Sequence, residues 1–207
     1  MKKTGPLFLF FATMLLLGCS SPSGKESSQG SSKQPAAPQL ETGRVALQKM
    51  IPPARFWSPD AQPMRLESEV TKENNGHDGK SGFWRATFAS PSKGKVETFT
   101  WSGLSDPDTP RGVDHGPQDS FNPLNRSTQP FELSFLKVDS DKAFEMAQQH
   151  GGKQLLAKDP TAGVRCVLDW DPQSAQLKWR ISYSGTDVSP RLSVIVNAST
   201  GDFVHKE

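Results

Sequence analysis

Four aspartates and one histidine occur in a single Pro- and Gly-rich stretch, and they are the side chains best suited to holding a metal ion. The set is Asp106, Asp108, Asp114, Asp119 and His115. Hard cations such as Ca²⁺ prefer several oxygen ligands. The spacing lacks the alternating ligands and the glycine of a calcium loop, so it favours a solvated acidic loop, and we predict no metal site. A hydrolase with its site in this loop is the third functional hypothesis.

Other reactive residue types give no catalytic pattern. His77 and Asp78 lie in NNGHDGKSG, a turn that Asn and Gly explain by themselves. Cys166 in VRCVLDW is expected to be a small buried hydrophobe and not a reactive thiol. The sequence has no H-E-x-x-H, no G-x-S-x-G, no paired C-x-x-C and no phosphate-binding Gly loop. We therefore predict no catalytic residue, no cofactor and no enzymatic activity.

Tryptophans are the remaining candidates for a binding site, because their rings can line a groove for a glycan or a peptide. Trp84 and Trp179 fall in predicted strands and are expected in the core. Trp57 lies in the Pro-rich segment ARFWSPD, and Trp101 and Trp170 are expected on a sheet face that one helix cannot cover. Trp57, Trp101 and Trp170 are thus the candidate ligand-binding residues of a second hypothesis, a small-molecule or glycan binder.

The N-terminus predicts a lipid anchor. The apolar run Leu7–Leu17 follows two lysines and is too short to span a bilayer comfortably, as in a signal peptide. LLLGC at its end is similar to a bacterial lipobox, in which the cysteine becomes the lipidated first residue of the mature chain. We predict a signal peptide over residues 1–18 and lipidation of Cys19 with palmitate-type chains, each buried CH₂ contributing about 0.8 kcal/mol.

The residues that follow bear on location and partners. Ser20, where Asp would favour the inner membrane, favours the outer membrane if the source is Gram-negative. Residues 19–40 are rich in Ser, Gly, Gln and Pro and are predicted to be a disordered tether. Removal of the two signal-peptide lysines from the 24 basic residues leaves 22, against 22 acidic ones. This balance gives no reason to expect nucleic-acid binding, and we predict a lipid-anchored protein of the bacterial cell envelope.

A short sequence motif that occurs twice indicates how the chain is organised. WRATFAS at residues 84–90 and WRISYSG at 179–185 both alternate after Trp-Arg, as strands with one buried face do. A helix signal precedes each copy, in TGRVALQKMIPP and in VDSDKAFEMAQQHGG. The first helix is expected to end at Pro52-Pro53, and the second to start at Asp139 or Ser140 and to stop at Gly151.

These elements predict an α+β fold of two tandem units. Each unit is one helix packed on a three- to four-stranded antiparallel sheet. The first unit covers residues 41–103 and the second covers 132–207. Residues 104–131 between them are expected to be a Pro- and Asp-rich linker loop without a regular element.

Three segments of the second half also carry a family resemblance. They are AFEMAQQHGG at the helix, WRISY in the middle strand and the ending SVIVNASTGDFV. Together they are similar to a PepSY domain, with Asn197 where Asp is usual, and the first half looks like a degenerate copy that lacks the Thr-Gly ending. The resemblance implies a PepSY/cystatin-like fold. It also implies a role in restraining a peptidase, because such domains occur in peptidase propeptides and in envelope lipoproteins.

The functional hypothesis is an envelope-anchored lipoprotein that acts as a non-enzymatic protein- or peptide-binding module. A small antiparallel sheet has exposed edges and one uncovered face, which suit strand addition by an extended peptide. The glycan or small-molecule binder and the loop hydrolase stay open as alternatives.

Overall fold

The computed structural model describes residues 37–207 apart from 73, 105–108, 126 and 185–188. Cys19, the signal peptide and most of the tether lie outside the described residues, so lipidation stays a prediction from the sequence. None of the helices in the described ranges combines the length and the hydropathy that a membrane crossing requires.

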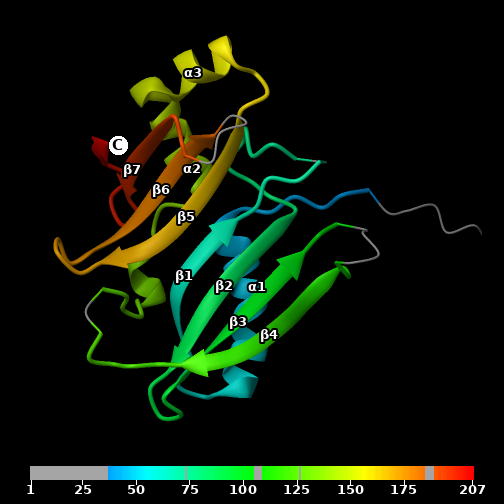
Figure 1. Cartoon of the computed structure of the whole chain (residues 1–207), viewed down its shortest axis with the longest axis vertical. Coiled ribbons are helices and arrows are strands. Elements are labelled where there is room, and N and C mark those ends of the chain that lie inside the picture. The colour runs from blue at the N-terminus through cyan, green and yellow to red at the C-terminus, as the bar shows by residue number, and fades with distance from the viewer. Residues whose placement is uncertain (1–36, 73, 105–108, 126, 185–188) are drawn as a thin grey trace, which may run out of the picture. The chain divides into compact units, whose positions relative to one another are not determined.

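The strands form one antiparallel sheet that runs through both halves of the chain (Figure 1). Its spatial order is β4-β3-β2-β1-β5-β6-β7-β8. The strands are β1 Gln62–Ser68, β2 Phe83–Ser90, β3 Lys95–Ser102, β4 Gly112–Ser120, β5 Gly163–Asp171, β6 Gln176–Ser184, β7 Leu192–Asn197 and β8 Phe203–Lys206. Each half thus supplies a four-stranded meander, with β1 and β5 at the centre.

The predicted fold class of two tandem helix-on-sheet units is wrong, because β1 pairs with β5. Leu66 lies opposite Leu168 in this antiparallel pairing, and Arg65 lies opposite Asp169. Unpaired strand edges expose backbone N–H and C=O groups, and joining the two meanders satisfies both inner edges at once. The described residues, from 37 on, accordingly belong to one compact unit.

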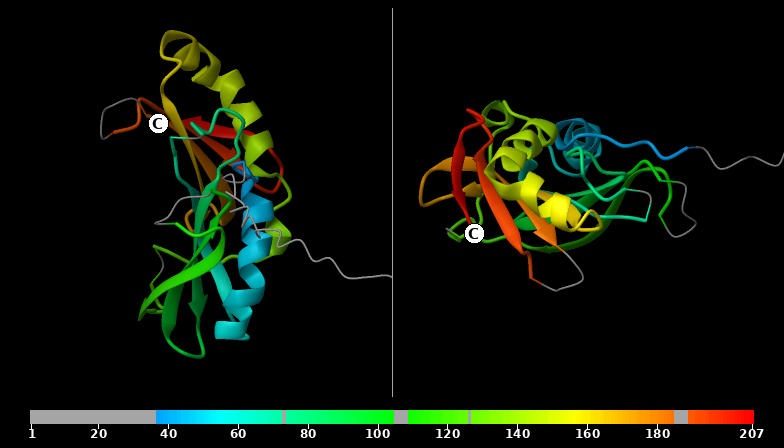
Figure 2. Two further views of the ribbon diagram at one scale, coloured as in Figure 1. Left: turned by 90° about the vertical axis from the view of Figure 1, so that its right-hand side faces the viewer. Right: turned by 90° about the horizontal axis from the view of Figure 1, so that it is seen from above.

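The helices cover one face of this sheet (Figure 2). They are α1 Gly43–Trp57, the short 3₁₀ turn η1 Leu133–Phe135, α2 Ser140–Ala147, the π-type turn η2 Gln148–Gly152 and α3 Lys153–Lys158. The expectation that α1 stops at Pro52-Pro53 is wrong, since the helix continues to Trp57 and buries Ala54. Gly151 has a φ of 114° at the kink between α2 and α3, a conformation that glycine adopts readily.

The segment 104–131 is not a plain linker, because it contains β4. This strand pairs with β3 along its length even though it includes Pro117. The pairing shifts register between Glu97 and Phe99. Proline is tolerated here because β4 is an edge strand, where an N–H on the outer side needs no partner within the sheet.

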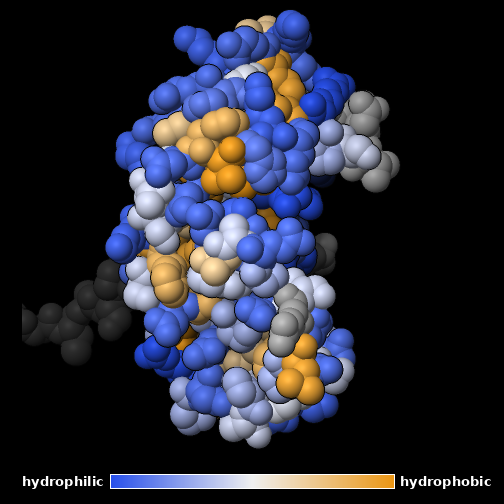
Figure 3. Space-filling model, turned by 90° about the vertical axis from the view of Figure 1, so that its left-hand side faces the viewer, coloured by the Kyte–Doolittle hydropathy of each residue, from blue (hydrophilic) through white to orange (hydrophobic). Residues whose placement is uncertain are grey.

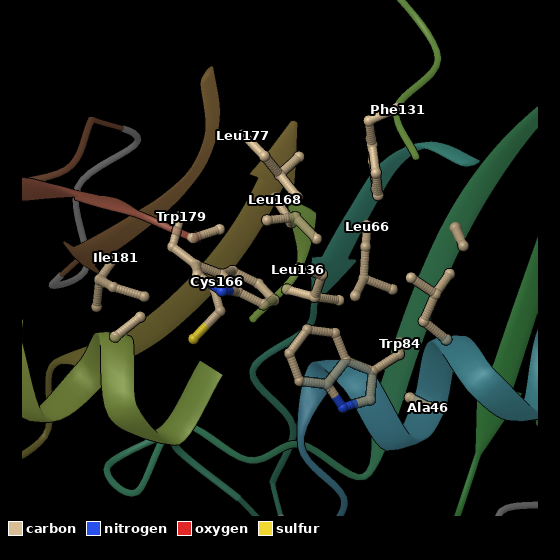
Figure 4. Close-up of a cluster of buried hydrophobic side chains, with 14 of the residues drawn as sticks. Ala46, Leu66, Trp84, Phe131, Leu136, Cys166, Leu168, Leu177, Trp179 and Ile181 are labelled. Carbon is tan, nitrogen blue, oxygen red and sulfur yellow. The ribbon is translucent and has the colours of Figure 1, made fainter. Parts of the chain in front are cut away.

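The two Trp-Arg motifs lie in corresponding strands, β2 and β6. Both tryptophans, Trp84 and Trp179, are fully buried, as expected. The rings of Trp84 and Trp179 meet edge to face across the β1–β5 junction, with centroids 6.4 Å apart (Figure 4). Each Nε1 donates at 2.9 Å to a carbonyl just before a helix, Trp84 to Glu41 and Trp179 to Val138. The first residue of α1, Gly43, packs against these rings. It has to be a glycine, because a Cβ at this position would lie 2.6 Å from the Trp179 ring.

Asp139 joins the starts of both helices. It is the N-cap residue of α2, where its Oδ1 accepts from the backbone N–H of Ser140 at 2.7 Å. The same carboxylate accepts from the N–H of Arg44 at 2.9 Å and from the Thr42 hydroxyl at 2.6 Å at the start of α1. One carboxylate therefore satisfies N–H groups that both helices would otherwise leave unpaired.

Candidate functional site

The sheet face opposite α1 and α2 carries polar and charged side chains. Alternation places every second residue of the central strands on this face, because neighbouring side chains in a strand point to opposite sides. These residues include Arg65, Glu67, Arg85, Thr87, Asp169 and Arg180. Since no described helix lies over them, this face is open to a partner.

A chain of ion pairs crosses the middle of the open face. Arg85 contacts Glu69 at 2.7 Å and Glu67 at 3.3 Å. Arg65 contacts the same Glu67 at 3.2 Å and reaches across the junction to Asp169 at 2.7 Å. Exposed pairs of this kind contribute about 0–1 kcal/mol each to stability, so their main effect is to hold the side chains in place.

The environment of Asp169 shows how far this face is desolvated. Burial raises the pKa of the Asp169 carboxyl, and the guanidinium groups of Arg65 and Arg180 oppose that shift. The Asp169 carboxylate is thus partly shielded from water and close to two cations, while its side chain remains 36% exposed.

A cleft of about 860 Å³ opens over this recess. Its floor includes Arg65, Thr87, Asp169 and Arg180. The segment Ser127–Gln129 forms one part of the wall and Asp171–Gln173 another. The first wall is tied to β1 a few residues later, where Phe131 donates its N–H to the carbonyl of Pro63 at 2.8 Å. The lining combines guanidinium donors, carboxylate acceptors and hydroxyls, a set that suits recognition of polar groups.

The edges of the sheet are less suited to binding than its face. On β4, Asp114 accepts from the backbone N–H of His115 at 2.8 Å, and Asp119 accepts from that of Ser120 at 2.6 Å. Pro117 has no N–H to offer. At the other edge β8 has only four residues and an irregular register. Short, charged and proline-containing edges discourage strand addition, which leaves the open face as the candidate site.

Trp101 does not lie on the uncovered sheet face, where the sequence analysis predicted it. It is opposite Trp84 in the β2–β3 register, so it points to the helix side and is 3% exposed. The Lys49 ammonium of α1 lies 4.5 Å from the centre of its ring. The expectation that Trp101 faces solvent on the uncovered side is therefore wrong.

The other two candidate tryptophans are both half-buried but occupy different parts of the fold. Trp57 ends α1, with its ring centroid 6.3 Å from that of Phe99. Trp170 lies near the end of β5, 5.2 Å from the ring of Phe135, and it lines the cleft. Trp170 lies opposite the buried Leu177 on the helix side of the sheet, so the expectation that it lies on the uncovered face is wrong. It still lines the end of the cleft, and Trp57 lies elsewhere.

The acidic stretch lies partly outside the described residues, which exclude Asp106 and Asp108. Asp114 and Asp119 are on β4, and His115 Nδ1 is 2.8 Å from the buried Glu97 carboxylate. Within the ranges the structure describes, no group of three or more His, Cys, Asp or Glu side chains is placed to hold a metal ion.

Two further residues from the sequence analysis have structural contacts. His77 Nε2 lies 2.6 Å from the carbonyl of Ala162, which ties its turn to the start of β5. Burial raises the pKa of the Cys166 thiol to about 12, and the side chain is 2% exposed. The expectation of a small buried hydrophobe at Cys166 is confirmed.

Arg65, Asp169 and Arg180 are the site residues that the sequence analysis did not select. Alternation after Trp179 does place Arg180 on the face away from the core, so one part of the signal was present. The cleft itself depends on the β1–β5 pairing, which no local pattern indicates.

Comparison with known proteins gives a fold but no family. No family model and no curated protein sequence matches the chain. The crystal structure of a candidate lipoprotein from Clostridium difficile 630 is similar, with a TM-score of 0.51 and 13% sequence identity. The match covers 78% of this chain and 91% of that one. At this identity the likeness shows a shared fold alone, and the PepSY resemblance stays a prediction from the sequence.

Proposed function

We propose that this protein is a cell-envelope lipoprotein that binds a protein or peptide partner without catalysis, through the open face of its sheet. The observation that carries the proposal is the cleft over Arg65, Asp169 and Arg180. The cleft is lined by guanidinium, carboxylate and hydroxyl groups. It opens on the sheet face that the helices leave uncovered (Figure 1).

The residues that line the cleft are mostly polar or charged. On the side of the molecule that Figure 3 shows, apolar surface is broken into separate patches within a mostly hydrophilic surface. Interfaces of this kind take their specificity from a few anchors, which are often Arg and Trp. The cleft supplies such anchors in Arg65, Arg180 and Trp170.

Attachment to the envelope rests on the predicted lipidation of Cys19. A fold shared with a candidate lipoprotein is compatible with it. The PepSY resemblance supports a peptidase as the partner to be restrained, and Ser20 supports the outer membrane in a Gram-negative cell.

The alternatives have weaker support. A glycan platform built from Trp57, Trp101 and Trp170 would need three accessible rings, and Trp101 is buried under α1. A hydrolase site at Asp114 and His115 would need a nucleophile within reach of the histidine, and among the described residues the polar contact of the His115 ring is with Glu97.

Photo-crosslinking in living cells tests the proposal. A benzoylphenylalanine at Gln129, on the cleft wall, is compared with one at Gln48, exposed on α1, in the full chain. We expect Gln129 to trap a discrete protein and Gln48 not to trap it. Thr87→Arg then fills the cleft floor, while Thr98→Arg adds the same side chain opposite Thr87 on β3, outside the cleft.

The two threonine variants decide the outcome. Thr87→Arg should reduce crosslinking at Gln129 by at least about tenfold, because a bulky cation in a filled recess excludes the partner. Thr98→Arg should leave it near the wild-type level. Equal crosslinking in both variants would refute the cleft as the binding site, and so would a trapped species that is glycan and not protein.

A further inference from the structure

The last turn of α1 carries an apolar side chain that the fold leaves uncovered. Phe56 is 95% exposed, more than any other large apolar side chain among the described residues. Pro52, one turn earlier, and Pro59, just after the helix, are exposed as well. Single exposed apolar residues are common on protein surfaces, but a phenylalanine left almost entirely in water adds nothing to the core. Its surroundings therefore decide whether it is a contact site.

The end of α1 is joined to the turn between β2 and β3. Asp60, which follows the helix, accepts from the hydroxyl of Ser90 at 2.7 Å and from the backbone N–H of Ser92 at 2.8 Å. Both segments lie at one end of the sheet, and α3 lies at the opposite end (Figure 1). We call the surface formed by residues 52–60 and 91–95 the α1 end.

The exposed cations of the α1 end lie close to Phe56. Arg55 precedes it in the helix and is exposed. The ammonium group of Lys93 lies 5.1 Å from the centre of the Trp57 ring, so it is held beside the last turn of α1. Lys95, the first residue of β3, is also exposed and points to the sheet face that α1 covers, because Trp101 on the same strand does so.

The acids near these cations offset them only in part. Glu97 is 3% exposed and contacts His115 at 2.8 Å. Asp119 lies opposite Val96 in the β3–β4 register and so points to the other sheet face. Asp60 is half-buried, and its oxygens already accept from three groups. Among the described residues of the α1 end, exposed cations thus surround an exposed apolar side chain.

The bilayer that is predicted to hold the lipid anchor is the partner that fits this surface. Protein segments at a membrane surface insert aromatic or aliphatic side chains among the headgroups, while Lys and Arg approach anionic phosphates. Ala37, the first described residue, follows Cys19 by 18 positions, and a chain of that length spans at most about 60 Å. The 15 residues of α1 extend over only about 22 Å. The chain is therefore long enough for the α1 end to reach the membrane.

We infer that the α1 end rests on the surface of the membrane. Phe56 inserts among the lipid headgroups, and the cations Arg55, Lys93 and Lys95 lie next to lipid phosphates. The predicted acyl chains of Cys19 supply the anchoring, and this weaker second contact fixes the orientation of the domain. In that orientation the last turn of α1 faces the bilayer and α3 points away from it (Figure 1).

A fluorescent label one helical turn before Phe56 tests the inference. Pro52→Cys is labelled with a nitrobenzoxadiazole group in the full, lipidated chain, and a label on Gln154→Cys, exposed on α3, is the reference. Cys166 is buried and does not compete for the label. The proteins are reconstituted into vesicles of phosphatidylethanolamine and phosphatidylglycerol that contain a lipid with a shallow nitroxide quencher. We expect quenching at residue 52 to be at least about threefold stronger than at residue 154.

Phe56→Ser, combined with the label at residue 52, removes the inserted side chain. It should reduce quenching at residue 52 to the level at residue 154, because insertion scales with the apolar area buried. The variant should keep the wild-type unfolding midpoint, since Phe56 is 95% exposed. A loss of quenching together with a loss of stability would contradict the inference.

Charge reversal tests the role of the cations. Arg55→Glu with Lys95→Glu should weaken quenching at residue 52 more in these anionic vesicles than in phosphatidylcholine vesicles. Lys153→Glu with Lys158→Glu makes the same charge change on α3 and is the matched control. It should leave quenching unchanged, and equal losses in the two double variants would contradict the inference.

Three further outcomes would overturn the inference. They are equal quenching at residues 52 and 154, unchanged quenching in Phe56→Ser, and a chain that does not sediment with the vesicles. A label at residue 52 whose emission shifts to the blue without quenching would show that a second copy of this chain covers Phe56, which also overturns it. The cleft lies on the other face of the sheet and is tested by crosslinking at Gln129, so failure here leaves the proposed function unchanged.

Discussion

At the scale of single residues, two aspartates make folding sensitive to pH, Asp171 at the end of β5 and Asp60 between α1 and β1. The hydrogen bond from Lys178 lowers the pKa of Asp171 to about 2, with further help from the Ser174 hydroxyl. The hydroxyls of Ser58 and Ser90 and the N–H of Ser92 likewise hold the pKa of Asp60 well below its usual range. Both carboxylates are bound more favourably as anions in the folded chain than in the unfolded one.

The sign of the pH effect follows from these lowered pKa values. A carboxyl group with a depressed folded pKa stabilises the fold above its unfolded pKa, here 3.8, and that contribution is lost as the pH falls through the folded value. Asp171→Asn should therefore flatten the fall in stability between about pH 4 and pH 2. Urea unfolding midpoints across this range measure the effect. Asp202→Asn, at an exposed position, serves as the control, and an unchanged slope for Asp171→Asn would contradict the prediction.

At the scale of elements, the two helix starts depend on one carboxylate. Asp139 accepts hydrogen bonds from Thr42, Arg44 and Ser140, which belong to both helix N-termini. Asp139→Ala should lower the free energy of unfolding by about 2–3 kcal/mol, since each lost cap costs about 0.5–2 kcal/mol.

The same site offers a graded control. Asp139→Asn keeps one acceptor oxygen and should cost about half as much, because an amide can still cap one helix. Asp141→Ala changes a neighbouring acid whose carboxylate accepts from the N–H of Lys142, within its own helix, and should have a small effect. Chemical denaturation of the three variants gives the comparison. Equal losses in Asp139→Ala and Asp141→Ala would show that the shared cap is unimportant.

At the scale of the whole molecule, the β1–β5 pairing predicts a single cooperative unfolding transition. The core is continuous across the junction through Trp84, Leu66, Leu168 and Trp179 (Figure 4). Unfolding one half would expose the apolar face of the other, so neither is expected to persist alone. Far-UV circular dichroism and tryptophan fluorescence should give coincident curves. Two separated transitions would indicate two independent folding units.

Membrane attachment is also a property of the whole chain, and it depends on a residue outside the described ones. Cys19→Ser should move the protein from the membrane fraction to the soluble fraction, because the acyl chains supply the anchoring energy. Cell fractionation and metabolic labelling with palmitate measure this. Cys166→Ser is the control, since the Cys166 thiol is buried. A Cys19→Ser protein that is processed and retained like the wild type would refute the anchor.

The sequence by itself determined the local elements, because their signals lie within a few residues of each other. Alternation after Trp84 and Trp179 placed both rings in the core, and Asp139 marked the start of α2. Only the tertiary structure decided that the halves share one sheet. Arg65 and Asp169 are 104 positions apart, and their contact depends on which strand edges meet. The pairing of distant edges is set by the packing of the whole core, so the cleft could not be predicted from periodicity.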